Sequence, residues 1–227
     1  MEVAKTRRNL PRVRAKGTLR RRLTAQTSTL NINADAISAI LAPIYTELPK
    51  TAAAGQHNLT YGEIEWQTLK LMLEYAQKQE CPGLHTFYDL GCGRGRAVLY
   101  MALSGIFHSC VGIEVLPERI SLSQKALAKL RTVIPTAGAK VRLYEASFLN
   151  PAFKYKDARM IFLSNLCFDK DTQDALFSKL NAEMQKGSLV FCSKMPDVNP
   201  AAFEVVGVQK VPMTWTLNSE IHILRHL

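Results

Sequence analysis

Residues 87–96 constrain the fold more than any other part of the sequence, because an apolar stretch there runs directly into three glycines at alternate positions. Gly91, Gly93 and Gly95 permit a tight turn and let a ligand approach the backbone closely. A helical pattern resumes after Gly95. A strand, a glycine loop and a helix in this order are typical of parallel α/β sheets, in which ligands bind beyond the carboxyl ends of the strands.

The rest of the chain alternates between strand and helix patterns, which predicts an α/β fold. Strands are expected at residues 85–90, 109–115, 141–146, 159–166 and 188–193, helices at 95–104, 117–132 and 171–185, and two further extended segments at 203–211 and 219–226. We therefore predict a seven-stranded, mostly parallel sheet with helices on both faces.

Two helices are predicted before this alternating region. The first covers residues 34–48, and Pro43 within it predicts a break or a kink. Residues 51–59 are small and polar and predict a loop. The second helix runs to about residue 79, and Thr60 and Glu63 have the spacing of a capping box at its start.

Positive charge is concentrated at the N-terminus. The formal net charge is +10, and residues 1–22 contain nine basic residues against the single acid Glu2, so this segment carries +8 and leaves about +2 for the rest of the chain. Residues 1–30 also lack apolar periodicity. We therefore predict a basic tail that is disordered when free and binds a polyanion. A mitochondrial targeting peptide has a similar composition and stays open as an alternative.

Several classes of site find no support in the sequence. The five cysteines are scattered and include no CxxC pair, which argues against a zinc site and against a disulfide framework. The five histidines show no metal-ligand spacing, and neither a GxSxG nor an HExxH motif occurs. No apolar run approaches the roughly 18 residues of a membrane span. We expect neither a metal nor a membrane partner.

The spacing of the glycine loop favours a cationic cofactor over a dinucleotide. Asp89 stands just before the first glycine, where its carboxylate would repel a pyrophosphate and attract the sulfonium of S-adenosylmethionine. Glu114 ends the next predicted strand, where an acid can accept hydrogen bonds from both ribose hydroxyls. Ser147 and Phe148 follow the third strand, where the adenine is expected and Phe148 can stack on it. Each signal alone is compatible with ordinary turn chemistry, but the three in this order predict S-adenosylmethionine.

The exit of the fourth predicted strand is the candidate substrate end of the site. Ser164 and Asn165 form a polar pair that is soon followed by Phe168, an arrangement that can orient an amine and enclose its alkyl stem. The same residues are compatible with a simple strand exit before a helix that Asp169 caps. Trp215, before the last extended segment, can line a channel or cover the core. Spacing alone leaves both questions open.

With these segments in order, the sequence from about Thr60 to Leu224 resembles the disruptor-of-telomeric-silencing family, the non-SET methyltransferases that modify a lysine in the globular core of histone H3. The pieces that carry the resemblance are Tyr61-Gly62-Glu63, the glycine loop, Gly112-Ile113-Glu114, Ser147-Phe148-Leu149, residues 161–168, Ser193-Lys194 and Thr214-Trp215-Thr216. Many methyltransferases share the glycine loop, whereas Tyr61-Gly62-Glu63, the exit within residues 161–168 and Thr214-Trp215-Thr216, in this order, are more specific to this family. The resemblance implies a Rossmann-like class I methyltransferase fold.

The resemblance also implies two sets of site residues. The cofactor set comprises Tyr61, Gly62, Glu63, Ile64, Phe87, Tyr88, Asp89, Leu90, Gly91, Cys92, Gly93, Arg94, Gly95, Arg96, Glu114, Ser147 and Phe148. The lysine channel comprises Ser164, Asn165, Leu166, Phe168 and Trp215, with Ser164 and Asn165 next to the transferred methyl. Three positions depart from the family pattern: Ser164 replaces an asparagine, Leu166 an aromatic residue and Ser147 an aspartate.

The expected activity is that of a histone-lysine N-methyltransferase that transfers methyl from S-adenosylmethionine to a lysine in the globular core of nucleosomal histone H3, in the nucleus. Residues 1–30 are expected to hold nucleosomal DNA, residues 31–59 to form a short helical lead-in, and residues 60–227 to form the methyltransferase domain. Three alternatives stay open: a methyltransferase for another protein, including a mitochondrial one; a methyltransferase for a small molecule; and a catalytically inactive module that binds nucleosomes or RNA.

Overall fold

The computed structural model describes residues 33–51, 62–78, 85–196 and 202–227. The basic tail, Thr60, Tyr61 and most of the predicted loop 51–59 lie outside these ranges. The elements along the chain are α1 (Ala34–Thr46), α2 (Trp66–Lys78), β1 (Thr86–Leu90), α3 (Arg96–Ser104), β2 (Ser109–Glu114), α4 (Pro117–Val133), α5 (Pro135–Gly138), β3 (Val141–Glu145), β4 (Ala158–Leu163), α6 (Lys170–Glu183), β5 (Leu189–Cys192), β6 (Phe203–Met213) and β7 (Thr216–His226).

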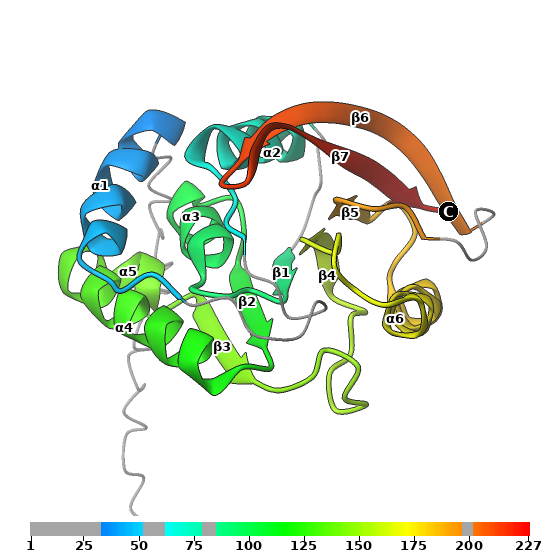
Figure 1. The fold of residues 1–227 in the computed structure, drawn as a ribbon, viewed down its shortest axis with the longest axis horizontal. Helices are drawn as coiled ribbons and strands as arrows, with labels where there is room; N and C mark the ends of the chain where they lie inside the picture. Colours follow the sequence, from blue (N-terminus) through cyan, green and yellow to red (C-terminus); the bar gives the residue numbers. More distant parts are fainter. Residues whose placement is uncertain (1–32, 52–61, 79–84, 197–201) are drawn as a thin grey trace, which may run out of the picture.

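One seven-stranded sheet, in the order β3-β2-β1-β4-β5-β7-β6, forms the centre of the molecule (Figure 1). The first five strands of this order are parallel to one another, and β7 runs antiparallel to both β5 and β6. The predicted mostly parallel sheet is confirmed. The chain proceeds outward from β1 to β3 and then returns to β4 beside β1. A ligand site is expected beyond the carboxyl ends of β1 and β4, because the order of the strands reverses there.

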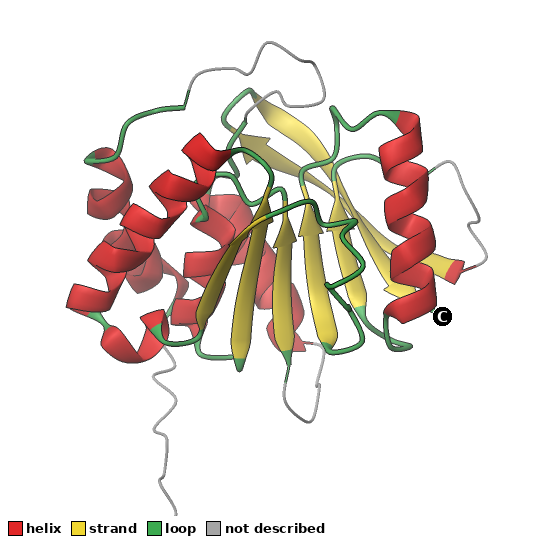
Figure 2. Cartoon of the chain, turned by 90° about the horizontal axis from the view of Figure 1, so that it is seen from below, coloured by secondary structure: helices red, strands yellow, loops and turns green. Residues whose placement is uncertain are grey.

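Helices lie on both faces of the sheet, as predicted, but they cover the two faces unequally (Figure 2). On one face α2, α3 and α4 share a continuous buried cluster with β1 and β2, and α1 adds Ile37 and Leu41 to it from outside. On the other face α6 shares a second cluster with β4 and β5. The connection at residues 146–157 is fully described and contains no helix. Instead, Phe148, Phe153 and Tyr155 of this connection pack onto the second cluster.

Two of the sequence predictions about local structure need correction. Helix α1 does not break at Pro43, which lies in its last turn, so the chain continues for only three helical residues beyond the proline. The capping box does not form: α2 begins at Trp66, and Glu63 lies before the helix. Glu63 instead pairs with two arginines, because charged guanidinium donors bind a carboxylate more strongly than one backbone amide does.

Smaller differences concern the ends of elements. The fourth strand ends at Leu163 rather than at residue 166, so Ser164 is the first residue beyond its carboxyl end. The last two strands form a long hairpin with Thr214 and Trp215 in its turn. Within the described ranges, none of the helices combines the length and apolar character that a bilayer crossing requires.

Candidate active site

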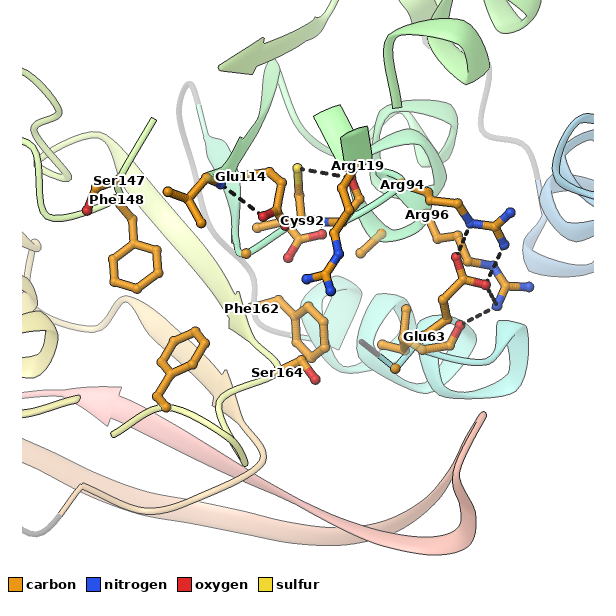
Figure 3. A pocket seen from close by; sticks show the side chains of 18 of the residues that line it. Glu63, Cys92, Arg94, Arg96, Glu114, Arg119, Ser147, Phe148, Phe162 and Ser164 are labelled. Atoms are coloured by element: carbon orange, nitrogen blue, oxygen red, sulfur yellow. Dashed lines mark hydrogen bonds and ion pairs between the residues drawn. The ribbon is translucent and has the colours of Figure 1, made fainter. Parts of the chain in front are cut away.

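A cavity of about 250 Å³ opens at the carboxyl ends of β1, β2 and β4, at the point where the strand order reverses (Figure 3). Its walls come from residues 62–64, the loop after β1, the end of β2, the connection after β3, the exit of β4 and the start of α6. These segments are far apart in the sequence, and the parallel sheet brings them together.

The loop after β1 adopts the backbone conformation for which its glycines were predicted. Gly91, Gly93 and Gly95 have φ values of 88°, 52° and 81°, a region that other L residues rarely occupy. The amides of Gly91 and Cys92 donate to the carbonyl of Ile113, at 2.8 and 3.1 Å, which ties the loop to β2. Gly91, Cys92 and Gly93 therefore form the floor of the cavity.

Glu114, at the end of β2, is held against this floor by backbone donors. One carboxylate oxygen accepts from the amide of Gly93 at 2.9 Å, and the other accepts from the amides of Val115 and Leu116, both at 2.9 Å. The carboxylate is thus fixed on the cavity wall. A carboxylate offers about four acceptor positions, so room remains for a hydroxyl donor from a ligand.

Asp89, at the end of β1, is the second acid of the cavity. Burial, and secondarily the nearby charge of Glu114, raise the pKa of Asp89 to about 8. Burial also holds the pKa of the neighbouring Cys92 thiol well above its usual value, which favours the protonated thiol over the nucleophilic thiolate. A cationic group in the cavity would offset the cost of ionising Asp89, which gives this wall a preference for positively charged ligands.

Glu63 closes one end of the cavity with two arginines of the loop after β1. Its carboxylate accepts two hydrogen bonds from Arg94, both at 2.6 Å, and one from Arg96 at 3.3 Å. The guanidinium of Arg96 also lies over the ring of Trp66, 4.1 Å from its centroid. Figure 3 shows the three charged side chains converging on one side of the cavity. These ion pairs attach residues 62–64 to the loop after β1. Both segments belong to the predicted cofactor set.

The opposite wall contains aromatic side chains and hydroxyl groups. Phe148 and Phe168 stack on each other, with ring centroids 5.4 Å apart and planes 24° apart. They form one aromatic surface, and Phe162 of β4 lines the cavity as well. Ser164 lies next to Phe162 and also lines the cavity. The β4 exit therefore presents a polar group beside aromatic surface, as the sequence predicted.

Asn165 does not take part in the cavity, which corrects the expectation that its side chain meets a substrate amine. Its amide oxygen accepts from the backbone of Ser193 and Lys194, at 2.9 and 3.0 Å. Its amide nitrogen donates to Gln173 at 3.0 Å and to the carbonyl of Lys194 at 2.8 Å. All four hydrogen-bonding positions of the fully buried side chain are used. Asn165 joins the exits of β4 and β5, and its contribution to the site is through their geometry.

The two remaining channel predictions, Leu166 and Trp215, lie outside the cavity walls. Both side chains are exposed, at 42% and 41% of their surface. Trp215 packs against Gly62, whose other side faces the cavity. In the described part of the chain, no group of histidine, cysteine and acidic side chains could hold a metal ion.

The model of the family described as Histone methylation protein DOT1 matches residues 44–210, which is well over half of the chain. The chain belongs to the DOT1 family. The match contains the 62–64 segment, the glycine loop, both acids and the β4 exit. All residues that line the cavity therefore fall within the matched region. A comparison with curated proteins found no match.

Solved structures support the fold assigned to this DOT1-family chain. A candidate RNA methyltransferase from Pyrococcus horikoshii, PH1948, has a TM-score of 0.60 at 12% identity over 85% of this chain and 99% of that one. A candidate methyltransferase from Escherichia coli, yhhF, has a TM-score of 0.56 at 13% identity over 79% and 89%. An rRNA methylase from Streptococcus thermophilus has a TM-score of 0.53 at 10% identity over 70% and 96%. At these identities the likeness concerns the Rossmann-like class I fold alone.

Family and fold together make the chain an S-adenosylmethionine-dependent methyltransferase. The residues of the cavity fit this cofactor. The two buried acids, Asp89 and Glu114, suit its cationic groups and its ribose hydroxyls, and the ring of Phe148 suits its adenine. The left-handed glycines leave the floor of the cavity free of side chains beyond that of Cys92.

Four members of the predicted cofactor set support the DOT1-family site from behind and do not line it. Phe87, Tyr88 and Leu90 are buried in the two core clusters, because side chains of a central strand point into the faces of the sheet. Gly95 begins α3 with its Cα turned toward Ser123. Tyr61 lies outside the described residues. The other members of the set, apart from these five, line the cavity.

The cavity also contains residues that the sequence analysis did not assign to the site: Ala97, Val115, Arg119, Leu149, Phe162, Asp169 and Thr172. Leu149 and Phe162 already stood in segments that carry the family resemblance, and Val115 directly follows the predicted site residue Glu114. Arg119 carried no such signal, because an arginine in the first turn of a helix is usually solvated. Here it is 6% exposed, and its guanidinium points into the cavity between Glu114 and Phe162 (Figure 3).

Proposed function

We propose that the protein is a histone-lysine N-methyltransferase that acts on a lysine in the globular core of nucleosomal histone H3. The observation that carries the proposal is the match to the DOT1 histone methylation family across the whole cavity. The apolar exit of β4, which opens into the same cavity as the acids, suits an alkyl amine. A nuclear location follows from such a substrate.

Tyr61, Gly62, Glu63 and Ile64, the loop at 91–96, Glu114, Ser147 and Phe148 would hold S-adenosylmethionine, which supplies an activated methyl group. Ser164, which lines the cavity, would accept a hydrogen bond from the substrate amine. Phe162 and Phe168 would enclose the lysine stem and exclude water. Desolvation by these rings lowers the pKa of the lysine and favours the neutral amine, which is the nucleophile. The protein would then accelerate the reaction mainly by aligning the amine with the methyl group and by excluding water from the site.

The test is transfer of labelled methyl to intact nucleosomes, to free histones and to free nucleosides, followed by mass spectrometry of histone H3. We expect label on one lysine of the H3 core in nucleosomes. A Gly93→Arg protein serves as control, because its side chain would enter the cavity and abolish cofactor binding. Label on another protein or on nucleosides, or a folded Gly93→Arg protein with unchanged activity, would contradict the proposal.

A further inference from the structure

The tip of the β6–β7 hairpin holds residues 62–64 by backbone and side-chain contacts. The amide of Thr214 donates to the carbonyl of Glu63 at 3.0 Å, and the amide of Glu63 donates to the hydroxyl of Thr214 at 2.8 Å. Ile64 forms an antiparallel bridge with Met213. Residues 62–64 are thus joined to the tip of the hairpin by an isolated bridge and two hydrogen bonds, although some 150 residues separate the two segments.

Trp215 is packed against the same segment. A Cβ atom built on Gly62 would lie 2.2 Å from two carbons of the indole, so the ring rests directly on the Gly62 backbone. Gly62 lines the cavity, whereas Trp215 does not. Gly62 therefore contacts the tryptophan and also lines the cavity. About two fifths of the Trp215 side chain stays exposed to solvent on the other side.

From Glu63 the contacts continue into the cofactor loop. The carboxylate binds Arg94 and Arg96, and Arg96 also donates to the carbonyl of Ile64 at 3.0 Å. Arg94 is fixed in turn by the carbonyl of Pro49 at 2.9 Å. The ion pairs are largely buried, with 13% of the Glu63 side chain and 6% of the Arg94 side chain exposed. Buried charge-assisted pairs resist separation, so the hairpin tip, residues 62–64 and the loop after β1 form one connected unit.

We propose that Gly62 and Glu63 are positioning residues that couple the Trp215 hairpin tip to the cofactor loop, so that the hairpin tip contributes to the affinity for the cofactor. Coupling of this kind is reciprocal: a polypeptide substrate that docks against Trp215 then strengthens cofactor binding, and bound cofactor strengthens docking. The inference rests on the cofactor site proposed above.

The test is the affinity for S-adenosylhomocysteine, measured by calorimetry without any protein substrate. Thr214→Val removes the acceptor for the Glu63 amide and keeps the shape of the side chain, and Trp215→Ala removes the ring from Gly62. We expect each change to weaken binding by about tenfold, a usual size for coupling between sites. Thr214→Ser keeps the acceptor and should restore wild-type affinity. Leu217→Ala is the matched control, since Leu217 lies on the same hairpin and is 79% exposed.

Steady-state kinetics distinguish positioning from a general loss of structure. With Thr214→Val, the KM for the cofactor should rise while kcat at saturating cofactor changes little. Wild-type affinity in both Thr214→Val and Trp215→Ala would overturn the inference, as would an equal loss with Thr214→Ser. If Trp215→Ala does not fold, the comparison of Thr214→Val with Thr214→Ser tests the inference by itself. Failure of the wild-type protein to bind the ligand would instead refute the cofactor site.

Discussion

Asp89 is the acid of the cavity whose ionisation the fold shifts into the physiological pH range. Its pKa is raised to about 8, first by burial and then by Glu114, so the carboxyl is largely protonated at pH 7 without ligand. A cationic ligand favours the ionised form and lowers this pKa. Cofactor binding should therefore release a proton at pH 7, and affinity should rise with pH until it levels off above about 8.

The measurement is calorimetric titration at pH 7 in buffers of different ionisation enthalpy. We expect the wild-type protein to release up to about one proton per cofactor bound. Asp89→Asn should bind more weakly at pH 8 and show no release attributable to this group. A wild-type binding heat that is independent of the buffer would show that Asp89 does not change its ionisation on binding.

Ser164 and Asn165 are neighbours with different expected roles. Ser164→Ala should lower kcat by about tenfold, which corresponds to the loss of roughly 1.4 kcal/mol from one hydrogen bond to the amine, with cofactor affinity unchanged. Asn165→Ala should lower the free energy of unfolding by about 3 kcal/mol, because it leaves buried partners on β5 and α6 unsatisfied. Urea unfolding and steady-state kinetics of both variants check this. A Ser164→Ala protein with full activity would remove Ser164 from the site.

At the scale of elements, close packing between β2 and the cofactor loop depends on the absence of a side chain at Gly112. A Cβ atom there would lie 2.8 Å from both the sulfur of Cys92 and a methyl of Leu143, and 3.0 Å from a methyl of Val98. Strand β2, the loop after β1 and α3 are thus closely packed around Gly112. A single methyl group at this position must displace at least one of them.

Gly112→Ala should therefore lower the free energy of unfolding by about 1–3 kcal/mol, the usual cost of overpacking a core. Because Cys92 lies on the floor of the cavity, cofactor affinity should fall as well. Denaturant unfolding and calorimetry measure the two effects, with Gly207→Ala as a control, since a Cβ at Gly207 meets only Ile223, at 3.4 Å or more. Equal behaviour of the two variants would show that the contact at Gly112 relaxes without cost.

At the scale of the whole molecule, charge is divided between a nearly balanced domain and a strongly basic N-terminus. Residues 1–22 carry +8 of the net +10. We propose that this segment supplies most of the electrostatic attraction to nucleosomal DNA. If six to eight of its charges meet phosphates, log affinity for duplex DNA should fall with log salt at a slope of roughly −5 to −7.

Deletion of residues 1–22 should flatten this slope and weaken nucleosome methylation through apparent affinity, while cofactor binding survives. Activity on nucleosomes at two salt concentrations, with and without the segment, is the measurement. Equal activity of the two proteins at both concentrations would contradict tethering and would favour a targeting role for the segment.

Local order along the chain was enough to predict the architecture, and within the site it predicted the glycine loop and Glu114. The glycine loop at 91–95 requires positive φ at three positions, and that requirement is a property of the local backbone. The acid at the end of β2 is equally local: Glu114 follows an apolar strand, so its place at the carboxyl edge follows from the parallel sheet. Such signals depend on residues that are neighbours in sequence, and they needed no knowledge of the final packing.

Contacts between distant segments were decided only by the tertiary structure. Glu63 had the spacing of a helix cap, but the fold brought Arg94 and Arg96 to it, and the charged pairs prevailed over the backbone amide. Asn165 was a candidate catalytic amide, but residues just after β5 and one residue of α6 take up all its hydrogen-bonding positions. Trp215 packs on Gly62, and Arg119 is buried with its guanidinium in the cavity, because the fold brings distant segments next to these side chains. Each of these side chains takes its role from partners remote in sequence, whose positions the local pattern does not specify.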